Sequence, residues 1–224
     1  ADSMKVYRYM DIGTAKPGPE ARAAVRHHLL DVVDPDEPFN ASLFAEQAGQ
    51  VIERLHREGK PIFVVGGTGL YLRVLLGGLA GVPGADERLR SRYREAGAER
   101  GVHHLHEALR RRDPRAAERI HPNDTVRIIR ALEVVTLTGE SIVSRQARHH
   151  FGEQRYRSLK IGLNPDREVL FARIEARVEA MLAQGLVDEV GALMAGGYDE
   201  TLKPMQSIGY RQIGECLRGK IDLP

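Results

Sequence analysis

The chain has 224 residues, and 42% of them are hydrophobic, which is enough to build one large domain or one domain with a small insert. A single cysteine, Cys216, excludes a disulfide framework and a thiolate metal site. No run approaches the roughly 20 apolar residues of a membrane span and no signal peptide opens the sequence, so we expect a cytoplasmic protein without membrane contacts. We also expect a monomer.

Positive charge is concentrated in one part of the chain. The net charge is only +2, but residues 85–160 hold 17 Lys and Arg against 11 Asp and Glu, whereas the remainder holds 16 against 20. A basic segment is typical of a protein that binds a nucleic-acid backbone. Solvated helix faces are often rich in arginine as well, so the charge alone leaves both interpretations open.

The first part of the chain alternates helical and extended patterns. Apolar residues recur at helical spacing from Asn40 or Ser42, either of which can cap a helix, to about residue 58. Residues 61–65 form a continuous apolar run, as in a strand buried on both faces of a parallel sheet. A glycine turn at 66–69 and another helix follow. This order predicts an α/β layered fold.

From residue 86 to about 148 the pattern is almost entirely helical and basic. Another short strand is expected at 159–163, and Asn164 or Asp166 then caps a long amphipathic helix. The sequence therefore predicts a helical insertion within an α/β domain. The predicted boundaries are 1–84 and 151–224 for the discontinuous α/β core and 85–150 for the insertion.

Two short segments of the α/β part have a functional and a structural interpretation. Asp2 can place a carboxylate at a strand end, where open α/β sheets bind ligands, or can cap a helix. The glycine turn at 66–69 offers backbone N–H groups beside a helix N-terminus, which suits an anion. The same turn can serve packing alone.

Arginines at helical spacing suggest two further binding sites. Arg127 and Arg130 are three residues apart and can bind successive phosphates, or can pair with acidic neighbours on a solvated helix. Arg173 and Arg177, four apart, can clamp a diphosphate or can form surface salt bridges. Histidines 103, 104 and 106 stand near no cysteine and no patterned carboxylates, so no metal site is expected among them.

Four sequence blocks resemble those of one enzyme family. Residues 2–17 read DSMKVYRYMDIGTAKP, and residues 65–71 read VGGTGLY. HPND at 121–124 with RALEV at 130–134 gives a third block, and QSIGYR at 206–211 gives a fourth. All four are similar to blocks of the tRNA dimethylallyltransferases, and they occur in the family order over nearly the whole chain.

This resemblance implies a fold and cofactors. The family fold is a P-loop-type parallel sheet layered with helices, plus a helical insertion, and the family binds a nucleotide and Mg²⁺. Its G-x-x-x-x-G-K-[ST] loop is expected upstream of Ala1, and its basic C-terminal region is expected beyond Pro224. Lys5 departs from the family pattern.

The resemblance also implies an activity and a set of site residues. The family transfers a dimethylallyl group from dimethylallyl diphosphate to the exocyclic amine of the adenine that lies 3′ of the anticodon in tRNA. Asp2 would be the general base, with Thr68 beside it in the catalytic site, and Arg173 and Arg177 would bind the diphosphate. The residues expected to bind tRNA are Asp2, Ser3, Met4, Lys5, Thr68, Arg90, Val126, Arg127, Ile128, Ile129, Arg130, Gln206, Ser207, Ile208, Gly209, Tyr210 and Arg211.

Two alternatives remain at this stage. A prenyltransferase for free adenine nucleotides would share the same blocks, although the basic insertion argues for tRNA, because a mononucleotide needs no such surface. A nucleotide-binding or RNA-binding scaffold without catalysis is the other alternative, since no phosphate loop stands in this sequence.

Overall fold

The computed structural model describes residues 1–79, 81 and 83–222, and it divides into two compact units. One unit combines residues 1–75 with 157–224, and the other comprises residues 76–156. The helical insertion expected at 85–150 lies within the second unit, and its role in binding stays a prediction. Ala80, Val82, Leu223 and Pro224, which fall within the expected core segments, lie outside the described residues.

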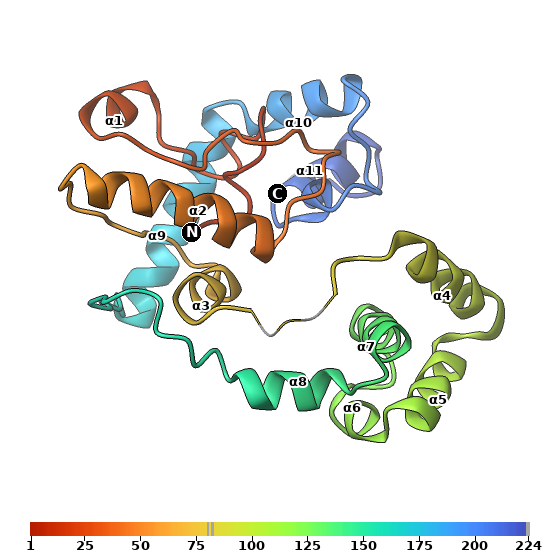
Figure 1. Cartoon of the computed structure of the whole chain (residues 1–224). Coiled ribbons are helices and arrows are strands. Elements are labelled where there is room, and N and C mark those ends of the chain that lie inside the picture. Colours follow the sequence, from red (N-terminus) through yellow and green to blue (C-terminus); the bar gives the residue numbers. More distant parts are fainter. Residues whose placement is uncertain (80, 82, 223–224) are drawn as a thin grey trace. The chain divides into compact units, whose positions relative to one another are not determined.

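Helices make up most of the described structure (Figure 1). In chain order they are α1 (Pro19–Ala24), α2 (Ala41–Arg57), α3 (Gly69–Gly77), α4 (Glu87–Arg100), α5 (Val102–Arg112), α6 (Pro114–Arg119), α7 (Thr125–Thr138), α8 (Ile142–His149), α9 (Arg167–Ala183), α10 (Leu186–Ala195), the 3₁₀ helix η1 (Pro204–Gln206) and α11 (Tyr210–Leu217).

The prediction of a P-loop-type parallel sheet is wrong for the described residues. They contain one isolated parallel bridge, between Tyr7 and Val33, and no sheet. The segment 61–65, expected as a buried strand, and the segment 159–163, expected as another short strand, form no strand, with Phe63 85% exposed and Leu163 92% exposed. A strand requires a neighbour that exchanges backbone hydrogen bonds with it, and the described part of the chain places none beside these segments.

The helices begin close to where local sequence signals place them. Asn40 caps α2, and its Oδ1 accepts hydrogen bonds from the amides of Ser42 and Leu43 at 2.9 and 3.1 Å. Asp124 caps α7 in the same way, and α7 ends at Gly139 in the left-handed conformation, with φ +69°. These caps satisfy amides and carbonyls that a helix end leaves free.

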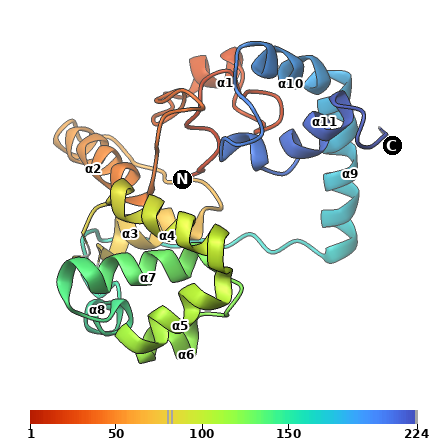
Figure 2. The ribbon, with the colours of Figure 1, turned by 90° about the vertical axis from the view of Figure 1, so that its right-hand side faces the viewer.

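The unit of residues 76–156 is built from α4 to α8, which Figure 2 shows in yellow-green to green. Helix α5 packs on α4, α6 and α7, and α8 packs on α6 and α7. The shared core contains Leu105 and Leu109 of α5, Ala116 of α6, and Ile128 and Leu132 of α7. The buried residues of α7 lie between Ile128 and Val134. Their packing fixes the rotation of the helix and therefore the direction of its exposed side chains.

Aromatic packing joins α2 to α3 in the other unit. The rings of Phe44 and Tyr71 stack with centroids 4.3 Å apart, and Phe39 meets Tyr71 edge-on at 6.3 Å. All three side chains are buried, as are Val6 and Met10 of the N-terminal segment. This packing buries large aromatic surfaces and holds α3 at a fixed place beside the first residues of the chain.

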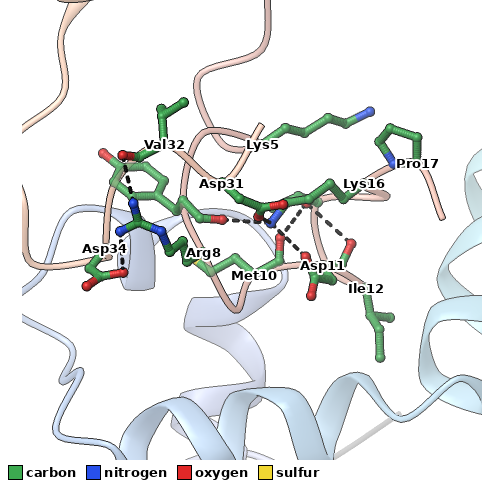
Figure 3. A network of polar contacts seen from close by, with 12 residues as sticks. Lys5, Arg8, Met10, Asp11, Ile12, Lys16, Pro17, Asp31, Val32 and Asp34 are labelled. Atoms are coloured by element: carbon green, nitrogen blue, oxygen red, sulfur yellow. Dashed lines mark hydrogen bonds and ion pairs between the residues drawn. The ribbon is translucent and has the colours of Figure 1, made fainter. Parts of the chain in front are cut away.

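A buried lysine holds the N-terminal segment together (Figure 3). The Lys16 side chain is 1% exposed, and its Nζ lies 2.6 Å from a carboxylate oxygen of Asp11, 2.6 Å from one of Asp31, and 2.7 Å from the Tyr7 carbonyl oxygen. Arg22 also pairs with Asp31, at 2.9 Å. Burial alone would raise the pKa of Asp31, but the hydrogen bonds from Lys16 and Arg22 prevail and lower it.

No helix among the described residues combines the length and the apolar character that crossing a membrane requires.

We predict that Lys16→Met lowers the free energy of unfolding by about 3 kcal/mol at pH 7, the lower end for a broken buried ion pair, because both carboxylates keep some solvent. Lys60→Met, which removes an exposed pair with Glu58, should cost under about 1 kcal/mol.

The stabilisation should depend on pH, because the pKa of Asp31 is lowered in the fold. The contribution of Asp31 to the free energy of unfolding is present above the ordinary aspartate pKa of about 3.9 and is lost as pH falls through the lowered value. Urea titrations at pH 7 and pH 3 should therefore show a smaller difference between wild type and Lys16→Met at pH 3. Equal losses from the two lysine variants at pH 7 would contradict this account.

Candidate functional site

Asp2 is held by its own backbone and keeps one carboxylate oxygen available. Its Oδ1 accepts hydrogen bonds from the amides of Met4, at 2.8 Å, and Lys5, at 3.4 Å. Within the described residues its Oδ2 makes no hydrogen bond, and the side chain is half-buried. Asp2 does not cap a helix, because no helix begins directly after it in the described structure, but these local bonds orient the carboxylate and leave one oxygen for a ligand.

The glycine turn brings Thr68 against the residues that surround Asp2. The Ser3 amide donates to Thr68 Oγ1 at 3.0 Å, and Thr68 Oγ1 donates to Ser3 Oγ at 3.3 Å. The Thr68 amide donates to the carbonyl oxygen of Ala1 at 3.2 Å. A Cβ at Gly66 would stand 2.1 Å from that same oxygen, so only glycine permits this approach. Ser3 and Thr68, which are 65 residues apart in the chain, therefore meet beside Asp2.

Tyr71 lies under this site and was assigned no role from the sequence. It is 5% exposed, and burial raises the pKa of its hydroxyl to about 12, with the charges of Tyr7 and Asp2 acting in the same direction. The hydroxyl therefore stays protonated at neutral pH. The signal that could have pointed to Tyr71 is its place at the end of the VGGTGLY block.

The segment 206–211 presents some of its residues to solvent and buries others. Gln206, Ile208 and Arg211 are exposed, and Ile208 reaches 91%. Tyr210 is 1% exposed and donates its hydroxyl to Glu189 at 2.6 Å. Burial, followed by this hydrogen bond, raises the pKa of Tyr210. The exposed side chains of this segment are thus available to a base edge or a phosphate, while the buried Tyr210 anchors the segment.

The remaining residues of the segment shape its backbone. Ser207 Oγ donates to the Pro204 carbonyl oxygen at 2.6 Å, and the Gly209 amide donates to Gln212 Oε1 at 2.9 Å. Gly209 has φ +90°, a conformation that side chains other than glycine rarely adopt. These contacts turn the chain sharply between η1 and α11.

In the helical unit, Arg90 and Arg130 surround one buried carboxylate. Glu133 is 0% exposed, and Arg90 donates to both of its oxygens at 2.9 Å. Arg130 and the Asp86 amide donate to the same carboxylate, and Arg130 also donates to the Pro83 carbonyl oxygen at 2.8 Å. Burial acts to raise the pKa of Glu133, but the hydrogen bonds from the two arginines prevail and lower it. The cluster therefore carries two positive charges and one negative charge at neutral pH.

The first turns of α7 separate into exposed and buried residues. Val126 is 80% exposed, and the Arg127 side chain is 77% exposed and pairs with Asp124 at 2.8 Å. Ile128 and Ile129 are buried in the core, so their side chains are not available to a nucleic acid. The ion pairs that the sequence left open for Arg127 and Arg130 are formed, and contact of either residue with RNA stays a prediction.

Arg173 and Arg177 lie on α9 with exposed side chains, and neither makes an ion pair within the described residues. Arg177 contributes to a pocket of about 320 Å³ whose other lining residues include Lys16, Asp11 and Gln184. Arg173 does not line this pocket. The surface salt bridges considered from the sequence are therefore not formed there.

The structure brings Asp2, Ser3 and Thr68 together in one unit, and Arg90 and Arg130 together in the other. Glu133, inside the RALEV block, was expected from the sequence as a partner of the arginines of α7 on a solvated face, but it is buried. Glu189 was not expected as an acceptor for any predicted site residue. Glu189 lies in no block, and nothing local marks it.

Comparison with known proteins gives one consistent result. The family model described as IPP transferase matches residues 5–224. The chain is 57% identical over 223 residues to tRNA dimethylallyltransferase 2 of Syntrophus aciditrophicus (strain SB), which covers 100% of this chain and 72% of that protein. The crystal structure of the full-length tRNA isopentenylpyrophosphate transferase from Bacillus halodurans is 39% identical, with a TM-score of 0.66, covering 99% of this chain and 69% of the other. A eukaryotic dimethylallyltransferase acting on tRNA is 28% identical, with a TM-score of 0.74, covering 98% of this chain and 56% of the other.

Proposed function

The chain belongs to the IPP transferase family, whose relatives are tRNA dimethylallyltransferases, and we propose that Asp2 is the residue that accepts the proton in its reaction. The reaction is prenylation of tRNA at the adenine next to the anticodon, with dimethylallyl diphosphate as the donor. In it, the exocyclic nitrogen of adenine forms a bond to C1 of the dimethylallyl group. The bond from C1 to the diphosphate oxygen breaks, and the nitrogen loses a proton.

The available oxygen of Asp2 is the observation that carries the proposal. An exocyclic amine is a weak nucleophile, because its lone pair is delocalised into the ring, so a positioned base is needed. Two backbone amides hold Asp2 Oδ1, which fixes the direction of Oδ2. A carboxylate with a fixed orientation and one free oxygen can accept the amine proton once the adenine has left its stack.

Thr68 supports this site by positioning. Its hydroxyl is engaged with the amide and the hydroxyl of Ser3, one residue from Asp2. We therefore propose that Thr68 sets the place of the Asp2 carboxylate and that its hydroxyl is not a proton carrier. The Ser3 hydroxyl, which accepts from Thr68, can still donate to a base edge.

The diphosphate requires cations, and the α9 arginines are the candidates. Arg173 and Arg177 are free of ion pairs within the described residues, so their donors are available to phosphate oxygens.

Mg²⁺, the expected cofactor, usually binds through one or two carboxylates, substrate phosphates and water, and it stabilises the charge of a leaving diphosphate. The described residues contain no group of three or more side chains of the kinds that commonly bind a metal ion. ATP binding by the expected phosphate loop also stays a prediction.

For the tRNA, we propose that the unit of residues 76–156 contacts the anticodon arm. The support is the excess of basic residues in 85–160 and the exposure of Arg127 and Val126. On the other unit, the exposed members of 206–211 and Met4 and Lys5 are the candidates for contact with the target nucleotide. Cytoplasmic location and a monomeric state fit this substrate and remain proposals.

We predict that the full-length protein transfers the dimethylallyl group to an anticodon stem-loop and not to free AMP.

We predict that Asp2→Asn lowers the single-turnover rate of this transfer by about 10² to 10⁴, the usual contribution of a positioned base. The asparagine keeps the acceptor oxygen for the Met4 amide, so binding of the stem-loop should stay near that of wild type. Asp36→Asn, which changes an exposed carboxylate, is the control and should leave the rate unaltered.

Two results would separate the alternatives. Equal transfer to AMP would favour an adenine-nucleotide prenyltransferase, and binding of the stem-loop without transfer would favour a scaffold. A near-normal single-turnover rate in Asp2→Asn would rule out Asp2 as the base while leaving the reaction itself in place.

We predict that Arg127→Ala weakens stem-loop binding and reduces the slope of log K against log salt concentration by about 0.7 to 0.9, the effect of one lost phosphate contact. Arg130→Ala should reduce the slope similarly, but it also leaves the buried Glu133 with one arginine fewer, so its thermal stability must be measured beside it. Arg119→Ala on α6 removes an exposed charge from the same unit and is the matched control. Binding of dimethylallyl diphosphate should be unaffected in all three.

Filter-binding titrations over a salt series decide the point. An unchanged slope in Arg127→Ala would show that Arg127 serves only its pair with Asp124. The same reduction in Arg119→Ala would show a general effect of lost positive charge and no specific contact at Arg127.

A further inference from the structure

The Glu189 carboxylate on α10 is the meeting point of four donors. Its Oε2 accepts the amides of Asp11 and Ile12 at 2.9 and 2.7 Å, and its Oε1 accepts the Gly13 amide at 3.1 Å. The Tyr210 hydroxyl donates to Oε1 at 2.6 Å. Three successive backbone amides that converge on one anion are a recurrent anion-binding arrangement, and here the anion is a side chain of the same protein.

The loop that supplies these amides is tightly turned. The Ala15 amide donates to the Ile12 carbonyl oxygen and the Lys16 amide to the Asp11 carbonyl oxygen, both at 2.9 Å. Thr14 Oγ1 donates to the Met10 carbonyl oxygen at 2.7 Å. These contacts point the amides of residues 11–13 away from the loop, so an outside acceptor must satisfy them.

The Tyr210 ring lies directly against the same loop. A Cβ built on Gly13 would stand 2.5 Å from Tyr210 Cε2 and 2.7 Å from Cζ, so glycine is required for this contact. Tyr210 is 1% exposed and is the first residue of α11. The exposed residues Ile208 and Arg211 flank it, and their directions follow from where the ring is held.

We propose that Glu189 is a positioning residue for tRNA prenylation, because it fixes residues 11–13 against Tyr210 and so holds the segment 206–211 in the geometry that receives the tRNA. The inference rests on the proposed function of that segment. Glu189 itself touches no substrate. It joins the first and the last of the sequence blocks, which are far apart in the chain.

The test is steady-state prenylation of an anticodon stem-loop by the full-length protein and its Glu189→Gln variant. Glutamine offers one acceptor oxygen and an NH₂ group, so it cannot accept from donors on both sides of the carboxylate. We expect KM for the stem-loop to rise about 10-fold, in line with the loss of charge-assisted hydrogen bonds. KM for dimethylallyl diphosphate and kcat should each stay within about 2-fold. A merely structural role would reduce the fraction of active enzyme, and hence kcat, without changing KM.

Three further variants sharpen the test. Glu189→Asp keeps the charge and should restore most of the affinity for the stem-loop. Tyr210→Phe removes one donor of four and should raise KM by less than Glu189→Gln does. Asp188→Asn is the matched control on the same helix turn, because Asp188 is exposed and accepts no hydrogen bond among the described residues.

Each outcome has one meaning. An active wild type with an unchanged KM for the stem-loop in Glu189→Gln overturns the inference alone. If Glu189→Gln does not fold, an unchanged KM for the stem-loop in Tyr210→Phe overturns the inference. A wild type that neither binds nor prenylates the stem-loop overturns the proposed function and this inference with it.

Discussion

The need to satisfy the backbone of an irregular segment shapes this structure. Residues 2–17 carry the first sequence block, yet in the described structure they form no helix and share only one bridge with another segment. Buried amides and carbonyls cannot stay unpaired without a large cost. Side chains therefore take the place of regular secondary structure, with Asp2 and Thr68 at one end of the segment and Lys16 and Glu189 at the other.

The carboxylates that pair with backbone or arginine donors fall into two kinds, according to whether both of their oxygens accept hydrogen bonds. Glu189 and Glu133 are saturated by donors and act as internal anions that hold a loop or two arginines in place. Asp2 is different, because backbone amides engage one oxygen and leave the other without a hydrogen bond among the described residues. Saturated carboxylates give the site its shape, and the unsaturated one can take a proton. The proposal that Asp2 is the base rests on this difference in its contacts.

Much of the helical structure was predictable, because its signals are local: Asn40, one of two expected caps, caps α2. The absence of a sheet from the described residues was not predictable. An apolar run such as 61–65 has the same sequence pattern whether or not partner strands lie beside it. The sequence blocks alone placed Asp2 and Thr68 in one site, and the hydrogen bonds of Ser3 with Thr68 bring the two residues close together. Glu189 escaped notice because its partners at 11–13 lie 176 to 178 residues away, and no spacing rule reaches so far.

We propose that side chains, in place of secondary structure, hold residues 2–17 rigidly enough to carry a catalytic base. Amide hydrogen exchange of the wild-type protein, resolved to single residues by NMR, measures this rigidity. We expect the amides of Ser3, Ile12 and Gly13, which donate to Thr68 and Glu189, to exchange at least about 10² times more slowly than in an unstructured peptide. The amide of Leu163, in an exposed segment that pairs with no strand among the described residues, should exchange near the peptide rate. Exchange of all four amides at the peptide rate would show that these side chains do not hold residues 2–17.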